Sequence, residues 1–577
     1  MMERRSKTAT RCACHEVARA RRRRNDPGCP RLLLPSSRMR WSSLWLAVSL
    51  CACAGASGAD PTTDDVGPPL DGALLETGDS TLDGVSPADV AVVPDSIGAA
   101  DVHNDAADAT SSETDPTPSG ACGGPLFIDA IASWKEVVVD GGGMDAIRSA
   151  ISTSDVTKAT RITVKAGTYN GQCLYVEDHL RDAKSPLWLR AEGVVQIDCT
   201  DGNGQAVAFA HSSYIAFDGF TIGPATGYYG DSAVHIAGSP VHPEDSAHYG
   251  EFLPSHHVIV RNLTARNLNR GPDGDGNPDS YESGCCDAVK SNQAEYIWVL
   301  DSTVSRTARH GFDNVGVHHA YFCHNTLTDM VGAGFAMEAK GGSNDILFQQ
   351  NMVRRARRRG IVLGGEGSDN VYMWPWDAKY EGTAEIARDN IVLDAAEGGL
   401  GFYGCRGCTA IGNSVWITKG YSTAPHDLFR LASSTIEGST SLWSPPRRAG
   451  ELLRNGDNRV IDNLFGDAAA ALDCAMNAND NGVDGLTMSH NSFWNGGKAL
   501  PECGSGATSL KSYTDAASFF GGVDPMITLA GTPTLLPDLT PKPGSPLISA
   551  GVADPALDAA DFAGKKRRSP PSIGALE

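Results

Sequence analysis

Short alternating apolar segments that end in Asn or Asp recur along the chain. Each has alternating apolar residues, then Asn or Asp, then a small or apolar residue and another apolar one. The residues at the Asn/Asp position are Asp218, Asn262, Asp301, Asn325, Asn351, Asn390, Asn413, Asn463 and Asn491. The shorter separations cluster near 25 residues, and the longer ones indicate single repeats with loop insertions.

A second short strand precedes a glycine-rich corner in several repeats, at 287–291, 311–316, 334–337, 360–365 and 399–404. Two or three strands of period two in each repeat predict a solenoid of stacked parallel sheets. Stacked Asn side chains hydrogen-bond along such an axis and satisfy backbone groups of the turn. The pattern therefore predicts an all-β, parallel β-helix domain over residues 121–577.

Four further segments carry a resemblance to a known family. Residues 162–169 look like the first coil of pectate-lyase-like right-handed β-helix proteins, and residues 144–151 resemble the short helix that caps their open end. Residues 542–551 and 572–577 are similar to the closing segment of many exported members. The resemblance implies a right-handed coil with an N-terminal capping helix. It implies no single reaction, because the fold hosts lyases, hydrolases, epimerases and non-catalytic adhesins.

An export signal is readable in residues 39–53. Met39 and Arg40 are followed by an apolar run over 41–50, which is too short for a bilayer that needs roughly 20 residues. The sequence up to Cys53 resembles a bacterial lipobox, so we expect a mis-called start before Met39 and a lipid on Cys53. The alternative is an ordinary cleaved signal without lipid. The expected location is the outer membrane, at the cell surface or facing the periplasm.

Charge is distributed unevenly along the chain, whose formal net charge is −21. Residues 1–53 are basic, whereas 54–120 contain fourteen acidic residues and no Lys or Arg. That second segment, rich in Asp, Ala, Pro and Thr, predicts a disordered tether. The remainder is moderately acidic, so nucleic acid is not an expected partner. We expect a monomer that meets the membrane only through its lipid.

Cysteine spacing agrees with a coil. Ten cysteines follow Cys53, and an even number in an exported chain favours disulfides. Cys173 and Cys199, and likewise Cys474 and Cys503, are separated by about one turn, so we predict two disulfides between neighbouring coils. The 405–408 motif, a lone CxxC, predicts a structural role rather than a metal or redox site.

Aligning the second strands on their glycine corners predicts one outward column of Lys290, Asp313, Ala336 and Val362. Flanking residues, among them Phe335, are then expected to face the core. Glu338 is expected on the same outer face as the column. The structural alternative for Lys290 and Asp313 is an exposed ion pair, worth under ~1 kcal/mol.

Polysaccharide β-elimination needs a cation that neutralises a uronate carboxylate, a base for the C5 proton and a donor for the leaving oxygen. Lys290 is the candidate base, although Asp313 favours its charged form. Arg309 and His310 are candidates for the donor or the carboxylate clamp.

Arginine residues are concentrated before two of the outward strands. Arg306 and Arg309 precede one strand, and Arg354, Arg355, Arg357, Arg358 and Arg359 precede another. The two groups are expected at equivalent corners, as one cationic stripe near Lys290. Arg354, Arg357 and Arg358 are thus candidate ligands of an anionic glycan. The alternative is a solvated basic turn paired with acids.

Two inserted loops flank this region. The first offers Asp273, Asp275, Asn277 and Asp279, alternating oxygen ligands that suit Ca²⁺, although a plain Asp/Gly turn explains them equally well. The second carries Trp374, Trp376 and Tyr380. These rings suit stacking on sugar faces, and packing as a cover over the solenoid is the alternative.

The sequence therefore favours an exported β-helix that binds a polysaccharide, with cleavage of an acidic glycan by β-elimination as its first enzyme hypothesis. A non-catalytic surface adhesin or glycan-binding module is the alternative from another class. A glycoside hydrolase is a weaker hypothesis, because Asp313 and Glu338 are the only acids expected on the outward face.

Overall fold

The computed structural model describes Cys122 and residues 124–199, 205–224, 232–240, 252–268, 286–332, 334–368, 372–418, 427–436, 448, 450–478, 483–501, 520–521, 524–526 and 539–577. The expected signal and tether, the Asp273–Asp279 ligands, Cys53 and Cys503 lie outside these ranges. Within them, no helix has the length and apolar character that crossing a bilayer requires.

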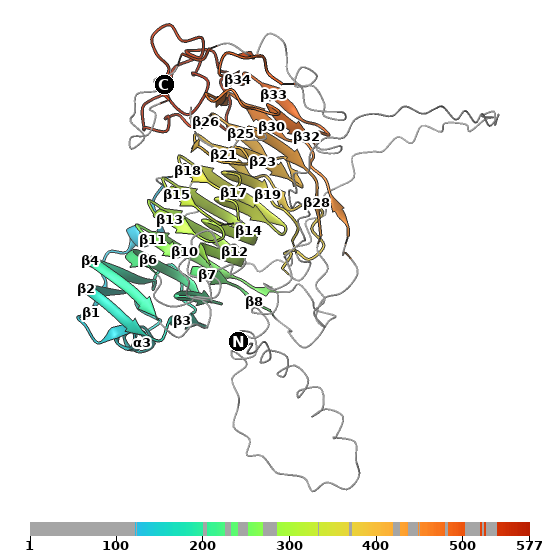
Figure 1. Ribbon diagram of the computed structural model, residues 1–577. Coiled ribbons are helices and arrows are strands. Elements are labelled where there is room, and N and C mark those ends of the chain that lie inside the picture. Colours follow the sequence, from blue (N-terminus) through green and yellow to red (C-terminus); the bar gives the residue numbers. More distant parts are fainter. Residues whose placement is uncertain are drawn as a thin grey trace, which may run out of the picture. The chain divides into compact units, whose positions relative to one another are not determined.

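The described part of the chain forms a parallel β-helix, which confirms the predicted right-handed coil (Figure 1). One turn of the coil has three faces. In the best-formed turn, face A is the first half of β12 (Asp287–Leu300), face B is its second half, and face C is β13 (Thr303–Thr307). The next turn repeats this with β14 (Phe312–Cys323) and β15 (Thr326–Met330), paired in parallel with the turn before.

Other strands extend the three faces. Face A also contains β3 (Leu174–Glu177), β5 (Val207–Ala210), β7 (Ser232–Ala237), β16 (Met337–Lys340), β19 (Ile361–Gly364), β23 (Leu400–Tyr403), β27 (Phe429–Ala432) and β32 (Met476–Ala478). Face B contains β1 (Lys135–Val139), β10 (Ser255–Arg261), β17 (Ser343–Gln349), β21 (Ile386–Arg388), β25 (Thr409–Ile411), β30 (Arg459–Ile461) and β33 (Thr487–Ser489). Face C contains β11 (Thr264–Leu268), β18 (Met352–Ala356), β22 (Ile391–Leu393), β26 (Ser414–Ile417), β31 (Leu464–Asp467), β34 (Ser492–Asn495) and β35 (Phe520–Gly521).

Three long strands cross from face B to face C: β2 (Thr160–Gly171), β4 (Leu187–Cys199) and β6 (Ser213–Ile222). Between faces A and B lie β20 (Gly382–Thr383) and β24 (Cys405–Arg406). Two antiparallel pairs stand apart from the coil: β8 (Ser239–Pro240) with β9 (Phe252–Leu253), and β28 (Ser434–Thr435) with β29 (Leu452–Leu453).

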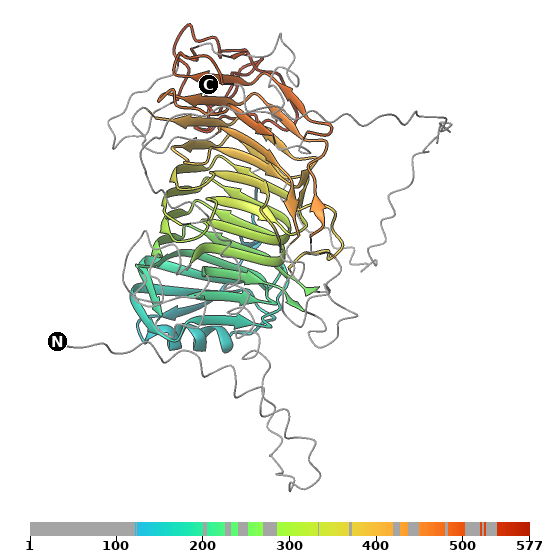
Figure 2. The ribbon, with the colours of Figure 1, turned by 45° about the vertical axis from the view of Figure 1, so that its right-hand side comes forward.

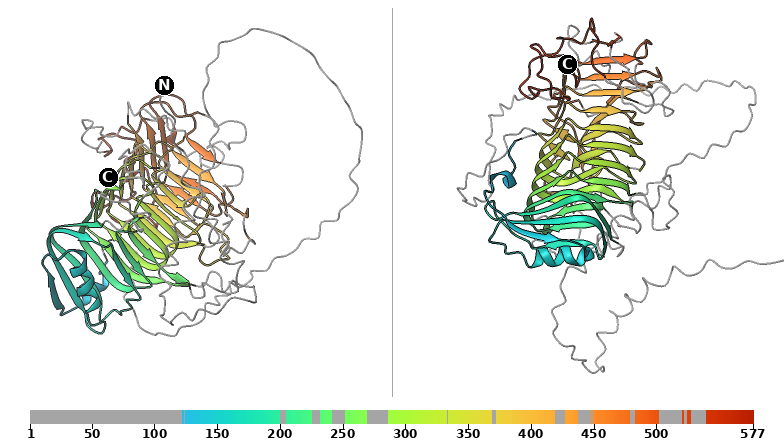
Figure 3. Two further views of the ribbon diagram at one scale, coloured as in Figure 1. Left: turned by 60° about the horizontal axis from the view of Figure 1, so that its bottom comes forward. Right: turned by 90° about the vertical axis from the view of Figure 1, so that its left-hand side faces the viewer.

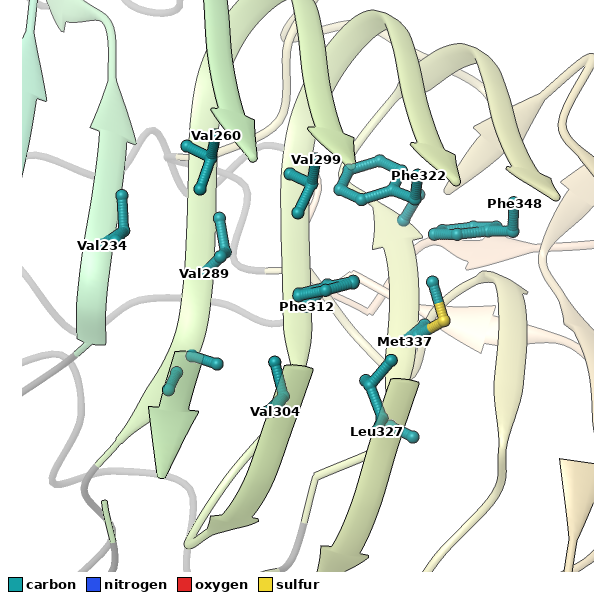
Figure 4. Close-up of a cluster of buried hydrophobic side chains, with 14 of the residues drawn as sticks. Val234, Val260, Val289, Val299, Val304, Phe312, Phe322, Leu327, Met337 and Phe348 are labelled. Carbon is teal, nitrogen blue, oxygen red and sulfur yellow. The ribbon is translucent and has the colours of Figure 1, made fainter. Parts of the chain in front are cut away.

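The interior is filled by apolar side chains stacked in columns, because every second residue of a strand points inward. On face A, Val234, Val289, Phe312 and Met337 form one such column (Figure 4). Faces B and C add parallel columns, such as Val260, Val299, Phe322 and Phe348, and Val304 and Leu327. No single turn buries its apolar face alone, so the turns stabilise one another.

A helix closes the first turns, as the resemblance implied. This helix, α3 (Gly143–Ser152), lies at the N-terminal end of the coil (Figures 2 and 3). It buries Met144, Ile147 and Ile151 against the coil. A short 3-10 helix, η2 (Phe127–Ala130), packs on the outer side of face B, where Phe127 contacts the rings of Tyr214 and Trp298.

The asparagine ladder is present for six of the nine predicted positions. Asn325, Asn351, Asn390, Asn413, Asn463 and Asn491 are buried, and each of the first five donates its side-chain amide to the next at 2.9–3.0 Å. The first three positions are wrong. Asn262 and Asp301 lie one residue earlier, in left-handed conformation, and Asp218 lies one residue earlier still. Ser302 occupies the ladder position there and accepts a hydrogen bond from the Leu263 amide.

Disulfides link turns of the coil. The predicted Cys173–Cys199 bond is present between neighbouring turns. Cys474 is also disulfide-bonded, but the predicted partner Cys503 lies outside the described residues. A third bond, Cys122–Cys323, joins the segment before η2 to face B. Cys405 and Cys408 form a disulfide with each other.

Candidate functional site

The outer side of face A carries the predicted column of charged residues. Lys290 pairs in register with Asp313, and Asp313 with Glu338, on three successive turns. Ala336 is not in this column, contrary to the glycine-based alignment. Two extra residues precede β16, so Met337 rather than Phe335 fills the core position opposite Phe312. Phe335 instead packs outside the coil with Val362 and Tyr403.

The turn between faces C and A brings further ionisable groups to this column. The His310 ring lies between two carboxylates: its Nδ1 is 3.1 Å from Asp287 Oδ1, and its Nε2 is 2.8 Å from Glu338 Oε1. The backbone N–H of His310 also donates to Asp287 Oδ1 at 2.8 Å. Arg309 Nε lies 3.7 Å from Asp287 Oδ1, and Arg309 Nη2 lies 3.8 Å from Asp313 Oδ2. The close approach of this turn requires Gly334, where a Cβ atom would clash with the His310 ring.

Lysine ammonium groups complete the arrangement. Lys290 Nζ is 3.1 Å from Asp313 Oδ2 and 3.8 Å from Asp287 Oδ2. Lys340 Nζ is 2.7 Å from Glu338 Oε1 and 3.7 Å from Asp313 Oδ1. We call the seven residues together the charged cluster: Asp287, Lys290, Arg309, His310, Asp313, Glu338 and Lys340.

The charged cluster is layered by exposure. The carboxylates of Asp287, Asp313 and Glu338 are buried. The cations lie above them, with exposed side-chain fractions of 12% for Lys290, 15% for Lys340 and 23% for Arg309. Solvent or a ligand therefore meets positive groups first. The predicted outward column does point away from the apolar core, but its acidic members are covered.

Mutual attraction sets the ionisation of the charged cluster. Burial acts against the charged form of His310, but the carboxylates of Glu338, Asp313 and Asp287 outweigh it and raise the pKa of His310 to about 9. Burial likewise opposes ionisation of Asp313, yet Lys340, Lys290, His310 and Arg309 hold its pKa well below the usual value. The pKa of Glu338 is lowered and that of Lys340 is raised, so both shifts favour the charged form. The electrostatics of the charged cluster therefore favour the charged forms of His310, Asp313, Glu338 and Lys340.

This geometry bears on two candidate roles, Lys290 as a base and the cluster as a metal site. The contacts of Lys290 with Asp313 and Asp287 favour its ammonium form, so they oppose the base role considered for Lys290. Asp287, His310 and Asp313 place their ligand atoms within 4.8 Å of one another, a spacing open to a metal ion. The Lys290 ammonium already lies against the same carboxylates, and a second cation there would be repelled.

The expected cationic stripe is largely neutralised by acids. Its two groups do follow equivalent face-C strands, β13 and β18. Asp329 lies between Arg306 and Arg355 and pairs with Arg355 at 2.6 Å. Three other arginines of this segment divide as follows: Arg358 pairs with Glu366 and Glu397, buried Arg359 pairs with Asp427 at 2.8 Å, and Arg357 is exposed. Arg354 is half-buried beside Asp329, whose pKa it helps to lower.

The three aromatic residues of the second inserted loop differ in role: some pack on the coil, and one is exposed enough to stack on a sugar. The Trp374 ring stacks on the His318 ring with centroids 4.4 Å apart, and the backbone carbonyl of Trp374 accepts a hydrogen bond from His318 Nε2. Trp374 therefore packs on the coil, as the covering alternative predicted. Trp376 has 44% of its surface exposed. The Tyr380 hydroxyl accepts a hydrogen bond from Arg406 at 2.7 Å, on a partly exposed edge. Trp376 is thus the ring best placed to meet a ligand.

Sequence reasoning missed Asp287 and Lys340 as members of the charged cluster. Neither was among the predicted site residues, although Asp287 begins the 287–291 strand segment and Lys340 closely follows Glu338. Lys340 follows Glu338 by two positions, so period-two alternation could have placed it on the same face. Asp287 reaches the site through the backbone and ring of His310, a contact that alternation does not predict.

Comparison with family models and with curated proteins found no match. Among solved structures, the chain is similar to a PL6-family polysaccharide lyase from Pseudopedobacter saltans, at 11% identity and a TM-score of 0.39 over 65% of this chain and 88% of that one. It is also similar to the pectate lyase Pel9A, at 14% identity and a TM-score of 0.36 over 78% and 97%. The A-module of a mannuronan C-5 epimerase from Azotobacter vinelandii aligns at 13% identity and a TM-score of 0.36 over 64% and 95%. Values this low transfer neither a reaction nor a substrate to this chain.

Proposed function

We propose that the protein binds an acidic polysaccharide on face A, with the charged cluster as the binding centre. The observation that carries this proposal is the layering of charge. Three buried carboxylates hold four cationic groups in place, and the cations are the more exposed members. A fixed group of cations over a buried acidic layer suits a ligand that brings carboxylates of its own.

Arg309 is the residue best suited to a uronate carboxylate. It is the most exposed cation of the cluster, with 23% of its side chain exposed, compared with 12% for Lys290 and 15% for Lys340. A guanidinium offers two parallel N–H donors to a carboxylate, which adds geometric selectivity to attraction. Lys290 and Lys340 then supply a positive background on either side along the column.

Cleavage by β-elimination is the second candidate function, and the state of His310 favours it. With a pKa of about 9, His310 is an imidazolium and a proton donor at neutral pH, and it becomes a base only above about pH 9. In this elimination a base removes the C5 proton, the C4–C5 double bond forms, and the C4–O bond breaks as the leaving oxygen is protonated. Because Asp313 and Glu338 both have lowered pKa values, neither supplies the protonated carboxyl group that a glycosidase needs.

Binding is tested with Arg309→Ala and a matched control, Arg161→Ala. Arg161 has a similar exposed side-chain fraction, 27%, and pairs with Glu136 between β1 and β2. Affinity electrophoresis through pectate, alginate and glycosaminoglycans should show binding that Arg309→Ala weakens roughly tenfold or more. The control should bind normally, and neutral dextran should retain neither protein. Equal binding by both variants, or no binding to any acidic glycan, contradicts the proposal.

Cleavage is tested separately by following the ultraviolet absorbance of the unsaturated product at several pH values. An acid role for His310 predicts a rate that falls above about pH 9, and a base role predicts a rate that rises through it. His310→Gln should abolish the change in either case. A flat trace at every pH, with binding retained, leaves a glycan-binding module of the adhesin type.

Export and anchoring are proposed on the residue pattern of 39–53 alone. The lipid belongs on Cys53, with residues 54–120 as the tether. Labelled fatty acid should enter the full-length chain in a bacterial host and should be lost in Cys53→Ala. Incorporation that persists in that variant overturns the assignment.

A further inference from the structure

A carboxyl group lies inside the coil, at a position that its neighbours fill with apolar or small side chains. Glu385 directly precedes β21, so it stacks between Ile346 on the turn before and Cys408 on the turn after. It is fully buried. Oε2 accepts a hydrogen bond from the Gly364 amide at 2.8 Å, and Oε1 has no hydrogen-bond partner among the described residues. A buried carboxyl with an unused oxygen is costly and calls for an explanation.

The charges around Glu385 do not supply that explanation. Burial raises the pKa of Glu385 well above its ordinary value, and Glu381 and Glu338 raise it further. Both neighbours are acidic, and neither provides the cation that usually accompanies a buried carboxylate. Glu381 is itself satisfied by Gly341, Ser368 and Ser434.

The Cys405–Cys408 disulfide lies against the same carboxyl. Both cysteines are fully buried, and Cys405 Sγ is 3.9 Å from Glu385 Oε2. The two sulfur atoms and the carboxylate oxygen all lie within 4.8 Å of one another. In tetrahedral zinc sites, Zn–S bonds of about 2.3 Å and Zn–O bonds of about 2.1 Å place sulfur and oxygen ligands roughly 3.6 Å apart. The observed separation is close to that value.

We propose that the reduced form of this site binds one thiophilic divalent ion, with Zn²⁺ as the model ion, through Cys405, Cys408 and Glu385. Two cysteines separated by two residues have the ligand spacing common in zinc sites. The Glu385 carboxylate supplies the third ligand, and no ion pair to it exists among the described residues. Residues 405–408 alone form a single CxxC, and the coil brings the third ligand from the preceding turn.

The chemistry balances with a dithiol reductant. The reductant gives up two electrons and two protons and becomes a disulfide, while the 405–408 S–S bond breaks and two thiols form. Metal binding then releases the thiol protons and the carboxyl proton of Glu385 to solvent, because thiolate and carboxylate are the ligands. The disulfide and the metal site exclude each other, so the site is open to metal only when reduced.

The test uses the chain produced in a reducing cytoplasm and kept in a phosphine reductant. With Co²⁺ as the probe, the wild type should show a thiolate-to-cobalt charge-transfer band and the strong visible bands of tetrahedral cobalt. Native mass spectrometry should show one Zn²⁺ per chain. The control is Cys405→Ser/Cys408→Ser, which keeps every other cysteine and should lose both signals.

Glu385→Gln tests the third ligand, and Glu385→Asp tests whether any loss is only a folding defect. We expect at least tenfold weaker Zn²⁺ binding in Glu385→Gln and partial recovery in Glu385→Asp, with circular dichroism unchanged. Equal metal content in the wild type and the double serine variant would assign the metal to other cysteines and overturn the proposal. Unchanged affinity in Glu385→Gln, or a 405–408 disulfide that persists in the reduced protein, would also overturn it.

Discussion

The asparagine ladder and the charged cluster are both columns of polar side chains on successive turns, but they are built differently. The ladder repeats one residue six times, and each amide bonds the next at 2.9–3.0 Å. The charged cluster spans only the turns of β12, β14 and β16, with seven residues of five kinds. The ladder satisfies its own hydrogen bonds, whereas the charged cluster presents cations to solvent above buried acids.

This difference separates scaffold from site. A repeated residue at equivalent positions does the same structural job on each turn, as in other solenoids. The charged cluster places unlike ionisable residues at equivalent positions of successive turns, so these residues do not share one repeated structural role. Burying such charges opposes folding unless each is paired. The ladder therefore serves stability, and we propose that the charged cluster serves ligand binding.

The largest expected effect comes from removing one cation of the charged cluster. Lys340→Met leaves the buried carboxylates of Glu338 and Asp313 with one ion pair fewer, so the free energy of unfolding should fall by about 3 kcal/mol. Urea unfolding at pH 7 measures it. Lys165→Met is the matched control, because Lys165 pairs with Glu192 at the surface and should cost under ~1 kcal/mol. Equal losses in the two variants would mean that the buried ion pairs of the charged cluster contribute no more to stability than a surface ion pair.

Breaking the ladder should affect stability alone. Asn390→Ala removes the acceptor for Asn351 and the donor to Asn413 and to the Phe348 carbonyl. The free energy of unfolding should fall by about 2 kcal/mol, since buried partners lose their hydrogen bonds. Asn344→Ala, on face B and outside the ladder, should cost less. Binding of acidic glycans to folded Asn390→Ala should be unchanged. A loss of binding would contradict a purely structural role for the ladder.

The two regions should also titrate in different pH windows. His310 in the charged cluster has a pKa raised to about 9, so its stabilisation is complete below the unfolded value of 6.5 and is lost as the pH rises through about 9. Asp462, beside the ladder, has a pKa raised by burial to about 7. Folding with this carboxyl protonated is favoured below its unfolded value of 3.8, and that advantage is lost as the pH rises through about 7.

Thermal unfolding from pH 4 to pH 10 measures both windows. Asp462→Asn should flatten the dependence between about pH 4 and 7, and His310→Gln should flatten it between about 6.5 and 9. The same window altered by both variants would argue against independent regions.

The smallest expected effect concerns the aromatic loop. Trp376→Ala removes an exposed ring and should weaken glycan binding by a factor of roughly three to ten, with little change in unfolding. Trp374→Ala should do the reverse, because that ring packs on His318. Titration calorimetry and thermal unfolding of both variants distinguish the two roles.

The coil could be predicted from the sequence because the information is local and repeated. Period-two alternation and recurring Asn fix strands and turns, and the register of Lys290 with Asp313 follows from them. Local shifts in register limited the prediction of individual side-chain positions. Two extra residues before β16 shifted the column from Ala336 to Glu338. One turn before Asn325, the ladder position is occupied by Ser302, one residue after the predicted Asp301. Contacts made through turns, such as His310 with Asp287 or Glu385 with Cys405, depend on backbone paths that alternation does not specify.

The most direct test of the central claim is a crystal structure of the protein with an acidic oligosaccharide bound. Our account predicts a uronate carboxylate against the guanidinium of Arg309, with Lys290 and Lys340 on either side along face A. An oligosaccharide held on face B or face C, with every ion pair of the charged cluster intact and no sugar within reach of Arg309, would contradict it.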